Sequence, residues 1–481
     1  MNRLKFLTGG TLFLFGILTS GLLFSCSSTD SSIDGPGGNG TYDTNSTDSG
    51  NSTDSNGAGD TDADSDSDSD SDGTVINFDS YLWVANSSDG TVSKIDTKLA
   101  VELARYRTCP QTVENTYCDP SRTSVNLHGD MVVTNRYPNP GTTSPKVFHP
   151  SSVTKIISSK ADCVDRNGNG KIDTSTGPDN ILPWPESGPE DECIAWNTPL
   201  KERDGARATG WDGTADPKTG KGGNVIIGSC KTGEADLQPS DSKDDNVVYM
   251  LDGDTGDIIE TSPILWGGNT VQTECFYGGA MDFKGWFWMM DGFGFPKRLV
   301  GFNTNAPSSD NLILPTLHCG YGISVDSHGR VWTGGKSYNM TDDNHPISCL
   351  QRYSPWDGGN SVDSEDLDGV FLRGIAVGSN ISEGFVWAAE TSGNLYKVDI
   401  NDLSVVDIVR IRGEEGNTDP NGLIGVAIDP EGYIWVVSAF DNAVYKFDPE
   451  TKKIIKVPVG KNPYTYSDMT GMQLKAAISI M

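Results

Sequence analysis

The stretch that decides the fold is GLIGVAIDPEGYIWVVSAFDNAVYKFDPETKKIIKVPV, residues 422–459. It contains four short runs rich in β-branched and aromatic residues, GVAID, YIWVV, AVYKFD and KIIKVPV, separated by turn-forming Pro, Gly, Asp and Asn. Such runs predict four antiparallel strands joined by tight turns. One small sheet of this kind cannot bury both of its faces, so it needs neighbours of the same kind.

The same pattern recurs along the chain at a spacing of about 45 residues, which is typical of β-propeller blades. The copies lie at 81–106, 123–156, 207–260, 278–304, 321–355, 373–411 and 422–459. The first copy has the last three strands but lacks the first. We therefore predict an all-β, seven-bladed β-propeller in which the C-terminal segment DMTGMQLKAAI (468–478) supplies the missing inner strand, because an open ring would leave strand edges unpaired. Six or eight blades are alternatives, since a long insertion splits the second copy.

A large aromatic residue recurs in the second strand of most copies, and we expect it to pack between blades. These residues are Trp83, Trp288, Trp332, Trp387 and Trp435. The rhythm GIAVDxxGxVWVA…VxKxD resembles NHL-type and streptogramin-lyase-like propellers and, more narrowly, uncharacterised propeller lipoproteins of Gram-negative bacteria. The resemblance covers residues 81–470 and implies the fold, but propellers host many unrelated functions.

The N-terminal 25 residues have the pattern of a secretory signal: two basic residues followed by an apolar run over 6–24. A transmembrane helix is the alternative, but the run ends in LLFSC without a stop-transfer pattern. Residues 23–26, LFSC, resemble a bacterial lipobox, which implies cleavage before Cys26 and lipidation of that cysteine. Ser27 at the next position favours the outer membrane, with the protein facing the periplasm or the cell surface.

The composition then changes to Ser, Asp, Gly, Asn and Thr, with thirteen aspartates and no lysine or arginine over residues 27–79. Such a segment cannot bury a core, so we predict a disordered tether over 26–79 and the propeller over 80–481. The formal net charge of the whole chain is −30. This charge disfavours nucleic acid and anionic membrane surfaces as partners. We therefore expect the protein to contact the membrane only through the lipid on Cys26. We also expect it to be a monomer.

Eight cysteines remain besides Cys26, and an even number in an exported chain predicts four disulfides. Eight cysteines allow 105 connectivities. We favour pairing in sequential order, which gives Cys109–Cys118, Cys163–Cys193, Cys230–Cys275 and Cys319–Cys349.

An insertion in the second copy, at about 157–205, contains DCVDRNGNGKIDTSTG (162–177), which matches the first half of an EF-hand calcium loop. The matching residues are Asp165, Asn167, Asn169, Lys171 and Asp173. Thr176 stands where a bidentate Glu belongs, and the flanks do not predict helices. The missing carboxylate is expected from Asp162, Asp179, Asp191 or Glu192. We predict a structural Ca²⁺ rather than a sensor; the alternative is an Asn- and Gly-rich turn held only by the disulfide.

Ligands of propellers usually bind where the first strands begin and the second strands end. The polar residues expected at the beginnings of the first strands are Arg122, Arg207, Tyr277, His318, Tyr321, Arg373 and Asn421. Those expected at the ends of the second strands are Asn86, Asp89, Asn135, Arg136, Asp291, Lys336, Glu390 and Asp441. From these we select Arg122, Arg207, Tyr321, Arg373, Asp291 and Glu390 as ligand-binding candidates. The arginines either hold an anionic ligand through bidentate hydrogen bonds or pair with Asp291, Glu390 and Asp441.

We expect a membrane-anchored, non-catalytic binding or scaffolding module whose ligand is a protein, peptide or glycan. A streptogramin-lyase-like lyase or a hydrolase is the alternative, and a surface-layer component is a third. Of five histidines, His318 is the one placed toward the channel mouth, so it is the candidate base. No GxSxG, HExxH, P-loop or CxxC motif is present.

Overall fold

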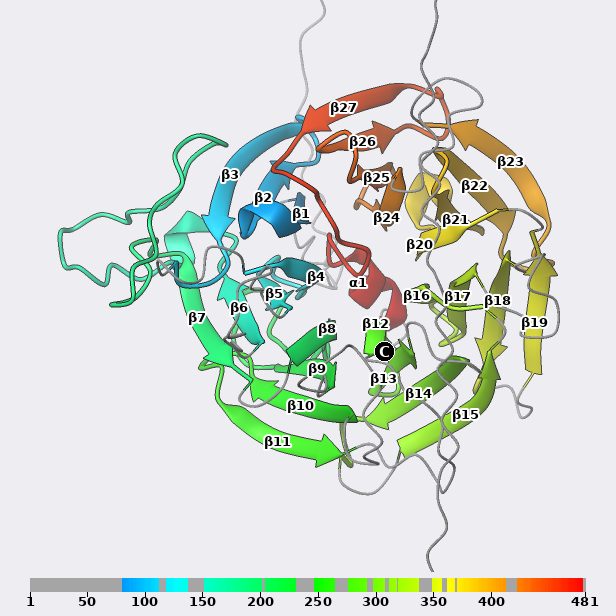
Figure 1. Ribbon diagram of the computed structural model, residues 1–481, viewed down its shortest axis with the longest axis horizontal. Helices are drawn as coiled ribbons and strands as arrows, with labels where there is room; N and C mark the ends of the chain where they lie inside the picture. Colours follow the sequence, from blue (N-terminus) through cyan, green and yellow to red (C-terminus); the bar gives the residue numbers. More distant parts are fainter. Residues whose placement is uncertain are drawn as a thin grey trace, which may run out of the picture. The chain divides into compact units, whose positions relative to one another are not determined.

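The strands form an all-β, seven-bladed β-propeller, as predicted. The computed structural model describes residues 80–111, 118–136, 151–200, 204–230, 246–263, 276–291, 297–307, 311–317, 319–336, 348–356, 361–367, 370–411 and 422–478. Within these residues seven antiparallel sheets surround a central axis (Figure 1). The strands of each sheet follow one another in chain order, and the first sheet has three strands where the other six have four.

The inner strands of the seven blades line the axis, and each later strand lies farther out. The first blade consists of β1 (Tyr81–Asn86), β2 (Thr91–Asp96) and β3 (Val101–Arg107), and the second of β4 (Pro120–Val125), β5 (Met131–Asn135), β6 (Ser152–Ile156) and β7 (Ile194–Pro199). The third consists of β8 (Asp204–Trp211), β9 (Asn224–Cys230), β10 (Asn246–Asp252) and β11 (Ile258–Pro263), the fourth of β12 (Phe276–Met281), β13 (Trp286–Asp291), β14 (Lys297–Asn303) and β15 (Asn311–Leu317), and the fifth of β16 (Gly322–Val325), β17 (Val331–Lys336), β18 (Ser348–Ser354) and β19 (Ser361–Asp366). The sixth consists of β20 (Leu372–Val377), β21 (Phe385–Glu390), β22 (Asn394–Asp399) and β23 (Val405–Arg410), and the seventh of β24 (Leu423–Ile428), β25 (Ile434–Ser438), β26 (Ala443–Phe447) and β27 (Ile454–Pro458).

The C-terminal part of the chain closes the ring, but through other residues than predicted. Residues 461–469, here called the closing segment, run beside the inner edge of β1. The bonds are Ser87 N–H to Asn462 O (3.2 Å), Tyr464 N–H to Ala85 O (2.9 Å) and Trp83 N–H to Met469 O (2.9 Å). These contacts are too irregular to form a fourth strand, so the first sheet keeps three strands.

The strand predicted within 468–478 is wrong at its C-terminal end, because Met472–Ile478 forms the helix α1. The Asp468 carboxylate accepts the backbone N–H groups of Gly471 (2.8 Å) and Leu474 (3.3 Å), and the helix sequence MQLKAAI is rich in good helix formers. Figure 1 shows α1 across the middle of the ring, in contact with β12, β16 and β24. It lies beside the turns that follow β4 and β8, so it closes one end of the channel.

The recurring tryptophans are fully buried, as the sequence predicts. Trp83, Trp288, Trp332, Trp387 and Trp435 each have 0% of their surface exposed. In three blades the indole N–H donates to a buried aspartate six residues earlier, as in the Asp429–Trp435 pair (2.9 Å). A buried indole N–H needs such a partner, because an unpaired polar group in the core is costly. The Asp of GVAID therefore has a structural role.

Lysines opposite these second-strand positions link neighbouring blades at three junctions. Lys446 pairs with Trp435 across β25 and β26, and its Nζ donates to the Thr97 carbonyl of the first blade (2.7 Å). Lys155 donates in the same way to the Gly253 carbonyl (3.0 Å), and Lys94 donates to the Ser158 carbonyl. Their aliphatic stems cover the core while the ammonium groups satisfy carbonyls between blades.

The insertion extends from Ile157 to Cys193, between β6 and β7, and projects from the side of the ring (Figure 1). It is shorter than the predicted 157–205, because residues 194–199 form β7. Three of the predicted disulfides are present among the described residues: Cys109–Cys118, Cys163–Cys193 and Cys319–Cys349, with Cα separations of 5.8, 4.8 and 5.6 Å. The predicted partner of Cys230, Cys275, lies outside the described residues.

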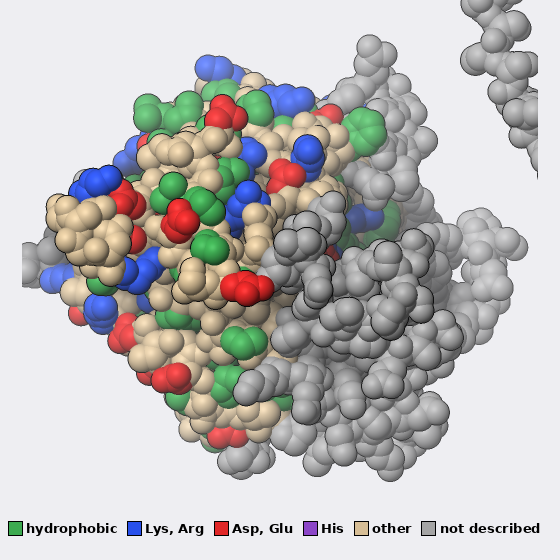
Figure 2. Space-filling model, turned by 60° about the vertical axis from the view of Figure 1, so that its left-hand side comes forward, with side chains coloured by type: hydrophobic (Ala, Val, Ile, Leu, Met, Phe, Trp, Pro, Cys, Tyr) green, Lys and Arg blue, Asp and Glu red, His purple; other side chains and the backbone are tan. Residues whose placement is uncertain are grey.

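The outer surface mixes charges of both signs. On the side seen in Figure 2, Lys and Arg alternate with Asp and Glu, and hydrophobic side chains are scattered. No helix of the described residues is long and apolar enough to cross a bilayer. The predicted signal peptide, Cys26 and the tether lie outside those residues.

Candidate functional site

The structure brings four of the six predicted ligand-binding residues together at one mouth of the channel. Arg122, Arg207 and Arg373 lie on β4, β8 and β20, and Tyr321 immediately precedes β16. Two tyrosines of the closing segment and one from β12 complete the group, which we call the Arg–Tyr cluster. Its members are Arg122, Arg207, Arg373, Tyr277, Tyr321, Tyr464 and Tyr466.

Three phenol hydroxyls form the centre of the Arg–Tyr cluster. The hydroxyl of Tyr277 lies 2.6 Å from that of Tyr464 and 3.2 Å from that of Tyr321, and the last two are also hydrogen-bonded to each other. Arg373 donates to the Tyr321 hydroxyl from Nη1 (3.3 Å). The ring of Tyr466 packs against both Tyr277 and Tyr321, with centroid distances of 5.7 and 4.9 Å.

Arg122 is the most buried charge of the cluster, with 0% of its surface exposed. Its Nε donates to the Tyr277 carbonyl (2.9 Å), Nη1 donates to Ser121, and the guanidinium lies 3.2 Å from the centre of the Tyr466 ring. Its Nη2 is buried and has no hydrogen-bond partner within the described part of the chain. The same holds for Nη1 of Arg207, which lies over the Tyr277 ring, and for the Tyr466 hydroxyl.

The charges of Arg122 and Arg207 are not balanced by acids among the described residues. No described carboxylate lies within hydrogen-bond or ion-pair distance of Arg122 or Arg207. Burial, reinforced by the positive charge of Arg207, lowers the pKa of Arg122 to about 9 despite the neighbouring tyrosines. Burial also raises the pKa of Tyr277, but Arg207 and Arg122 outweigh it, so the net pKa falls to about 8. The cluster therefore has a strong preference for negative charge.

The predicted acidic partners have other contacts. Glu390 accepts hydrogen bonds from the Ser392 backbone N–H (2.8 Å) and from Asn394 (3.1 Å), so it stabilises the turn after β21. Asp441 accepts from Ser438 (2.7 Å) in its own turn. The side chain of Asp291 is outside the described part of the structure. Glu390 thus has a structural role in this turn, and its predicted contact with a ligand stays a prediction.

A groove of about 580 Å³ opens beside the cluster, here called the mouth groove. It is lined by Arg136, Ile424, Ala439, Phe440, Asn462 and Tyr464. The Tyr464 ring separates the groove from the buried arginine: the guanidinium of Arg136 lies 4.9 Å from its centre and that of Arg122 lies 5.4 Å away. The volume is within the usual range for small-molecule sites, about 300–1,000 Å³.

The sequence did not indicate Tyr464 and Tyr466, because the closing segment was expected to supply an ordinary inner strand. The repeated aromatic of YTY, in a segment that must return to the axis, is the signal that could have identified them. His318 lies outside the described residues, so its predicted role as a base is untested. His328 is exposed on a turn after β16.

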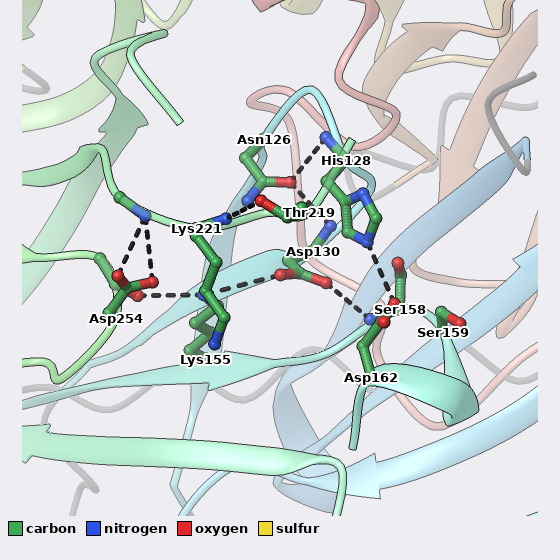
Figure 3. A network of polar contacts seen from close by, with 12 residues as sticks. Asn126, His128, Asp130, Lys155, Ser158, Ser159, Asp162, Thr219, Lys221 and Asp254 are labelled. Carbon is green, nitrogen blue, oxygen red and sulfur yellow. Dashed lines mark hydrogen bonds and ion pairs between the residues drawn. The ribbon is translucent and has the colours of Figure 1, made fainter. Parts of the chain in front are cut away.

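A second polar network lies on the opposite face, where the insertion leaves the ring (Figure 3). His128, in the turn after β4, contacts the Pro217 carbonyl through Nδ1 (3.2 Å) and Asp162 of the insertion through Nε2 (3.1 Å). Burial lowers the pKa of His128, but the hydrogen bonds to Asp162 and Pro217 outweigh it, so the net pKa is raised. Asp130 next to it accepts the Ser158 N–H (2.9 Å) and pairs with Lys155 (3.6 Å). This network attaches the insertion to the ring.

The loop predicted to bind calcium folds around its own carboxylates. Asp165 accepts the backbone N–H groups of Gly168 (2.7 Å) and Gly170 (2.8 Å), while Asn167 and Asn169 both direct their side-chain amides to Asp173. Lys171 also donates from Nζ to Asp173 (2.6 Å), so three side-chain donors surround this carboxylate.

Acidic side chains at the far end of the insertion lie beside this loop, as predicted, and they accept hydrogen bonds from its backbone N–H groups. Glu192 accepts the N–H groups of Arg166 (2.7 Å), Asn167 (3.0 Å) and Asp173 (2.8 Å). Asp191 accepts the Ser175 N–H (2.8 Å). Glu192 is thus engaged by backbone amides of the loop rather than placed as a bidentate ligand, and calcium binding stays a prediction.

Comparisons with known proteins agree on the fold. No protein-family model and no curated protein matches the sequence. The periplasmic gluconolactonase PpgL of Pseudomonas aeruginosa has a similar structure, with a TM-score of 0.50 and 11% identity over 80% of this chain and 97% of its own. A streptogramin B lyase gives a TM-score of 0.44 at 12% identity, over 75% of this chain and 87% of its own. AztD of Citrobacter koseri gives 0.42 at 13%, over 80% and 96%. At these identities the similarity shows a propeller fold alone.

Proposed function

We propose that the protein is an extracytoplasmic, non-catalytic binding module that holds an anionic group at the Arg–Tyr cluster. The observation that carries the proposal is the fully buried Arg122, whose Nη2 has no hydrogen-bond partner among the described residues. Arg207 and Tyr466 add two further buried donors without a partner there. An oxyanion is the ligand that accepts several such donors at once.

Energetic arguments support a ligand over a purely structural role for these arginines. A buried charge without compensation is strongly unfavourable, and proteins either pair such a group or leave it out. A bound anion would supply both the missing hydrogen-bond acceptors and the missing charge. The propeller holds the arginines on separate inner strands, so the site is rigid before the ligand arrives, which reduces the entropy lost on binding.

The cellular setting that we propose is a lipid anchor at Cys26, a tether over 26–79, and a monomeric propeller on the outer membrane. The sequence supports this through the lipobox-like LFSC and through the disulfides, which persist in oxidising compartments. The similar gluconolactonase PpgL is likewise described as periplasmic. The natural ligand is then a protein, peptide or glycan that presents an anionic group. The lyase alternative depends on His318, and no contact within the described residues favours it.

The proposal is tested by thermal unfolding of the full chain with sulfate, phosphate or acetate, at concentrations matched for ionic strength with chloride. A ligand at a hundred times its Kd stabilises the native state by about 2.7 kcal/mol. We expect at least one oxyanion to raise the melting temperature of the wild type and not that of Arg122→Met. Lys453→Met, an exposed change on the last blade, serves as control. If none of the oxyanions acts on the wild type, the proposal is wrong.

We also propose that the loop of Asp165, Asn167, Asn169, Lys171 and Asp173 binds a structural Ca²⁺. The spacing of these residues, which matches the first half of an EF-hand loop, supports it. Elemental analysis of the purified protein, with and without prior chelation, tests it. We expect about one calcium per chain in the wild type and none in Asp165→Asn/Asp173→Asn. Absence of calcium, together with melting unchanged by chelator, would overturn this assignment.

A further inference from the structure

Three hydrogen-bonded phenols lie beside two guanidinium groups at the centre of the Arg–Tyr cluster. These phenols, here called the phenol trio, belong to Tyr277, Tyr321 and Tyr464. Tyr277 and Tyr321 expose only 3% and 5% of their surfaces. The guanidinium carbons of Arg122 and Arg207 lie 4.7 and 4.6 Å from the centre of the Tyr277 ring. Two positive charges thus lie close to groups that become negative when they release a proton.

The phenol trio can supply the negative charge that these arginines lack among the described residues. No hydrogen bond or ion pair joins Arg122 or Arg207 to a carboxylate there. A buried positive charge without a counter-charge is unfavourable, so each guanidinium stabilises an ionised phenol beside it. Burial raises the pKa of Tyr277, but the two arginines and the hydrogen bonds to the other two phenols outweigh it, and the pKa falls to about 8. Burial raises the pKa of Tyr321 and of Tyr464, so Tyr277 ionises first.

We infer that anion binding at the Arg–Tyr cluster is linked to a proton: the phenol trio releases one proton as the pH rises, and the phenolate then competes with the anionic ligand for Arg122 and Arg207. This inference rests on the proposed function and adds the regulation of its site. The competition is electrostatic, because guanidiniums that favour a ligand anion favour a phenolate in the same way. An anion that binds to the ionised site takes up one proton from water, since linkage works in both directions. Tyr464, which is half-buried and lines the mouth groove, gives the trio a path for this exchange.

The other charged and titratable side chains that contact the phenol trio are mostly cations. Within the described residues they are Arg122 (β4), Arg136 (after β5), Arg207 (β8), Arg373 (β20) and Tyr466 (closing segment). Arg136 pairs with Asp119, which reduces its effect on the trio, whereas Arg373 donates to the Tyr321 hydroxyl (3.3 Å). Arg122 also titrates, because burial lowers its pKa to about 9. Anion binding therefore weakens at high pH for two reasons, which the experiment has to separate.

The first measurement is the near-ultraviolet absorbance of phenolate in the full chain, titrated from pH 6 to pH 11 without sulfate or phosphate. We expect one of the fifteen tyrosines to ionise with a midpoint near pH 8, ahead of the others, and no such step in the chain unfolded in urea. Sulfate at about ten times its Kd should raise this midpoint by about one pH unit, the shift that competition produces. Tyr277→Phe should remove the step. The control Tyr433→Phe, whose ring centre lies 4.0 Å from Nζ of Lys446 on the last blade, should keep it.

The second measurement is the affinity for sulfate, whose charge is constant over this range, by isothermal titration calorimetry of the full chain at pH 7 and pH 9. With a midpoint of about 8 the protonated fraction of the trio falls about tenfold between these values, so the affinity should fall at least tenfold. Arg122 is about half ionised at pH 9, so its titration alone weakens binding about twofold. Tyr277→Phe should therefore lose only about twofold between the two pH values.

The outcomes separate this inference from the proposed function. If sulfate binds but no tyrosine of the folded wild type ionises below pH 9, the inference is wrong and the anion site stands. A sulfate affinity that falls equally in the wild type and in Tyr277→Phe assigns the pH dependence to the arginine and also overturns the inference. If sulfate, phosphate and acetate all fail to bind at pH 7, the proposed function is wrong and the linkage falls with it, even where the absorbance step appears. Should Tyr277→Phe not fold, the wild-type midpoint decides: its shift by sulfate supports the competition, and a fixed midpoint overturns it.

Discussion

Replacing Arg122 by methionine should make the protein more stable in the absence of ligand while abolishing anion binding. The substitution keeps a long flexible side chain and removes the charge. It is informative because a structural arginine and a ligand-binding arginine predict opposite signs. Replacing a buried arginine that stabilises the fold lowers the free energy of unfolding of the protein. Replacing one that is stabilised only by a bound ligand raises the free energy of unfolding of the ligand-free protein.

The magnitude follows from the surroundings of the guanidinium. Burial lowers the pKa of Arg122 from 12.5 to about 9, and each unit corresponds to about 1.4 kcal/mol. Holding the charge in the folded protein at neutral pH therefore costs roughly 5 kcal/mol by this measure. The variant leaves the Tyr277 carbonyl and the Ser121 hydroxyl without their donor, a loss of about 3 kcal/mol for the two bonds, and forfeits the stacking on Tyr466, about 1 kcal/mol. We expect a net gain of about 1 kcal/mol in the free energy of unfolding.

The assay is equilibrium unfolding in urea, followed by tryptophan fluorescence in dilute buffer without sulfate or phosphate. The midpoint should rise with an unchanged dependence on urea. Arg352→Met is the matched control, because Arg352 donates to the carbonyls of Ile400 and Asn401 (2.8 Å each) and pairs with Asp363 (2.6 Å). Because all of these bonds are lost in the variant, Arg352→Met should lower the free energy of unfolding by about 1–3 kcal/mol. If Arg122→Met lowers the free energy of unfolding as much as Arg352→Met does, Arg122 stabilises the fold and the expected gain is refuted.

Three further results are expected. The pKa of His128 is raised in the folded state, so its link to the insertion is complete below about pH 6.5 and is lost as the pH rises through the folded pKa. The protection factors of the insertion amides, which correct for the base-catalysed intrinsic exchange rate, should be lower at pH 8.5 than at pH 5.5, and His128→Asn should make them independent of pH. Lys446→Met should lower stability by about 1–3 kcal/mol, because it removes a charged donor between the last and first blades; an effect no larger than that of the exposed Lys453→Met would contradict this. Replacing both Cys163 and Cys193 by alanine opens a loop closed over 30 residues, worth about 3–4 kcal/mol to the insertion; proteases should then cleave there first, with the ring intact, and cleavage elsewhere would refute the local role.

The sequence predicted the ring because its blades are repeats, and each local preference agrees with the global fold. The four runs at 422–459 became β24 to β27, and Trp435 became core. The exception is 472–478, where an apolar run was taken for a strand. There the Asp468 carboxylate accepts a backbone N–H at the start of the helix, and the residues that follow are good helix formers, so the segment is helical. No blade repeats that segment, so the pattern of the repeat gave no guidance.

The site was predicted in part for the same reason. Arg122, Arg207, Arg373 and Tyr321 were found because their position at the start of the inner strands follows from the repeat. Tyr464 and Tyr466 belong to the closing segment, where no repeat position exists. The contacts of Glu390 could not be predicted, because position alone does not reveal that neighbouring Ser392 and Asn394 donate to its carboxylate. Side-chain partners depend on rotamers, which a strand pattern does not specify.

The closing segment makes closure of the ring and completion of the Arg–Tyr cluster one event. Tyr464, Tyr466 and α1 follow all seven blades in the chain, so they leave the ribosome after every other described element. A nascent chain can assemble its blades in order, but the ring is not sealed and the Arg–Tyr cluster lacks Tyr464 and Tyr466 until residues 461–478 are made. The Arg–Tyr cluster is thus assembled only after the closing segment has been synthesised. A synthetic peptide of residues 461–478, added to a chain that lacks them, should restore both properties together.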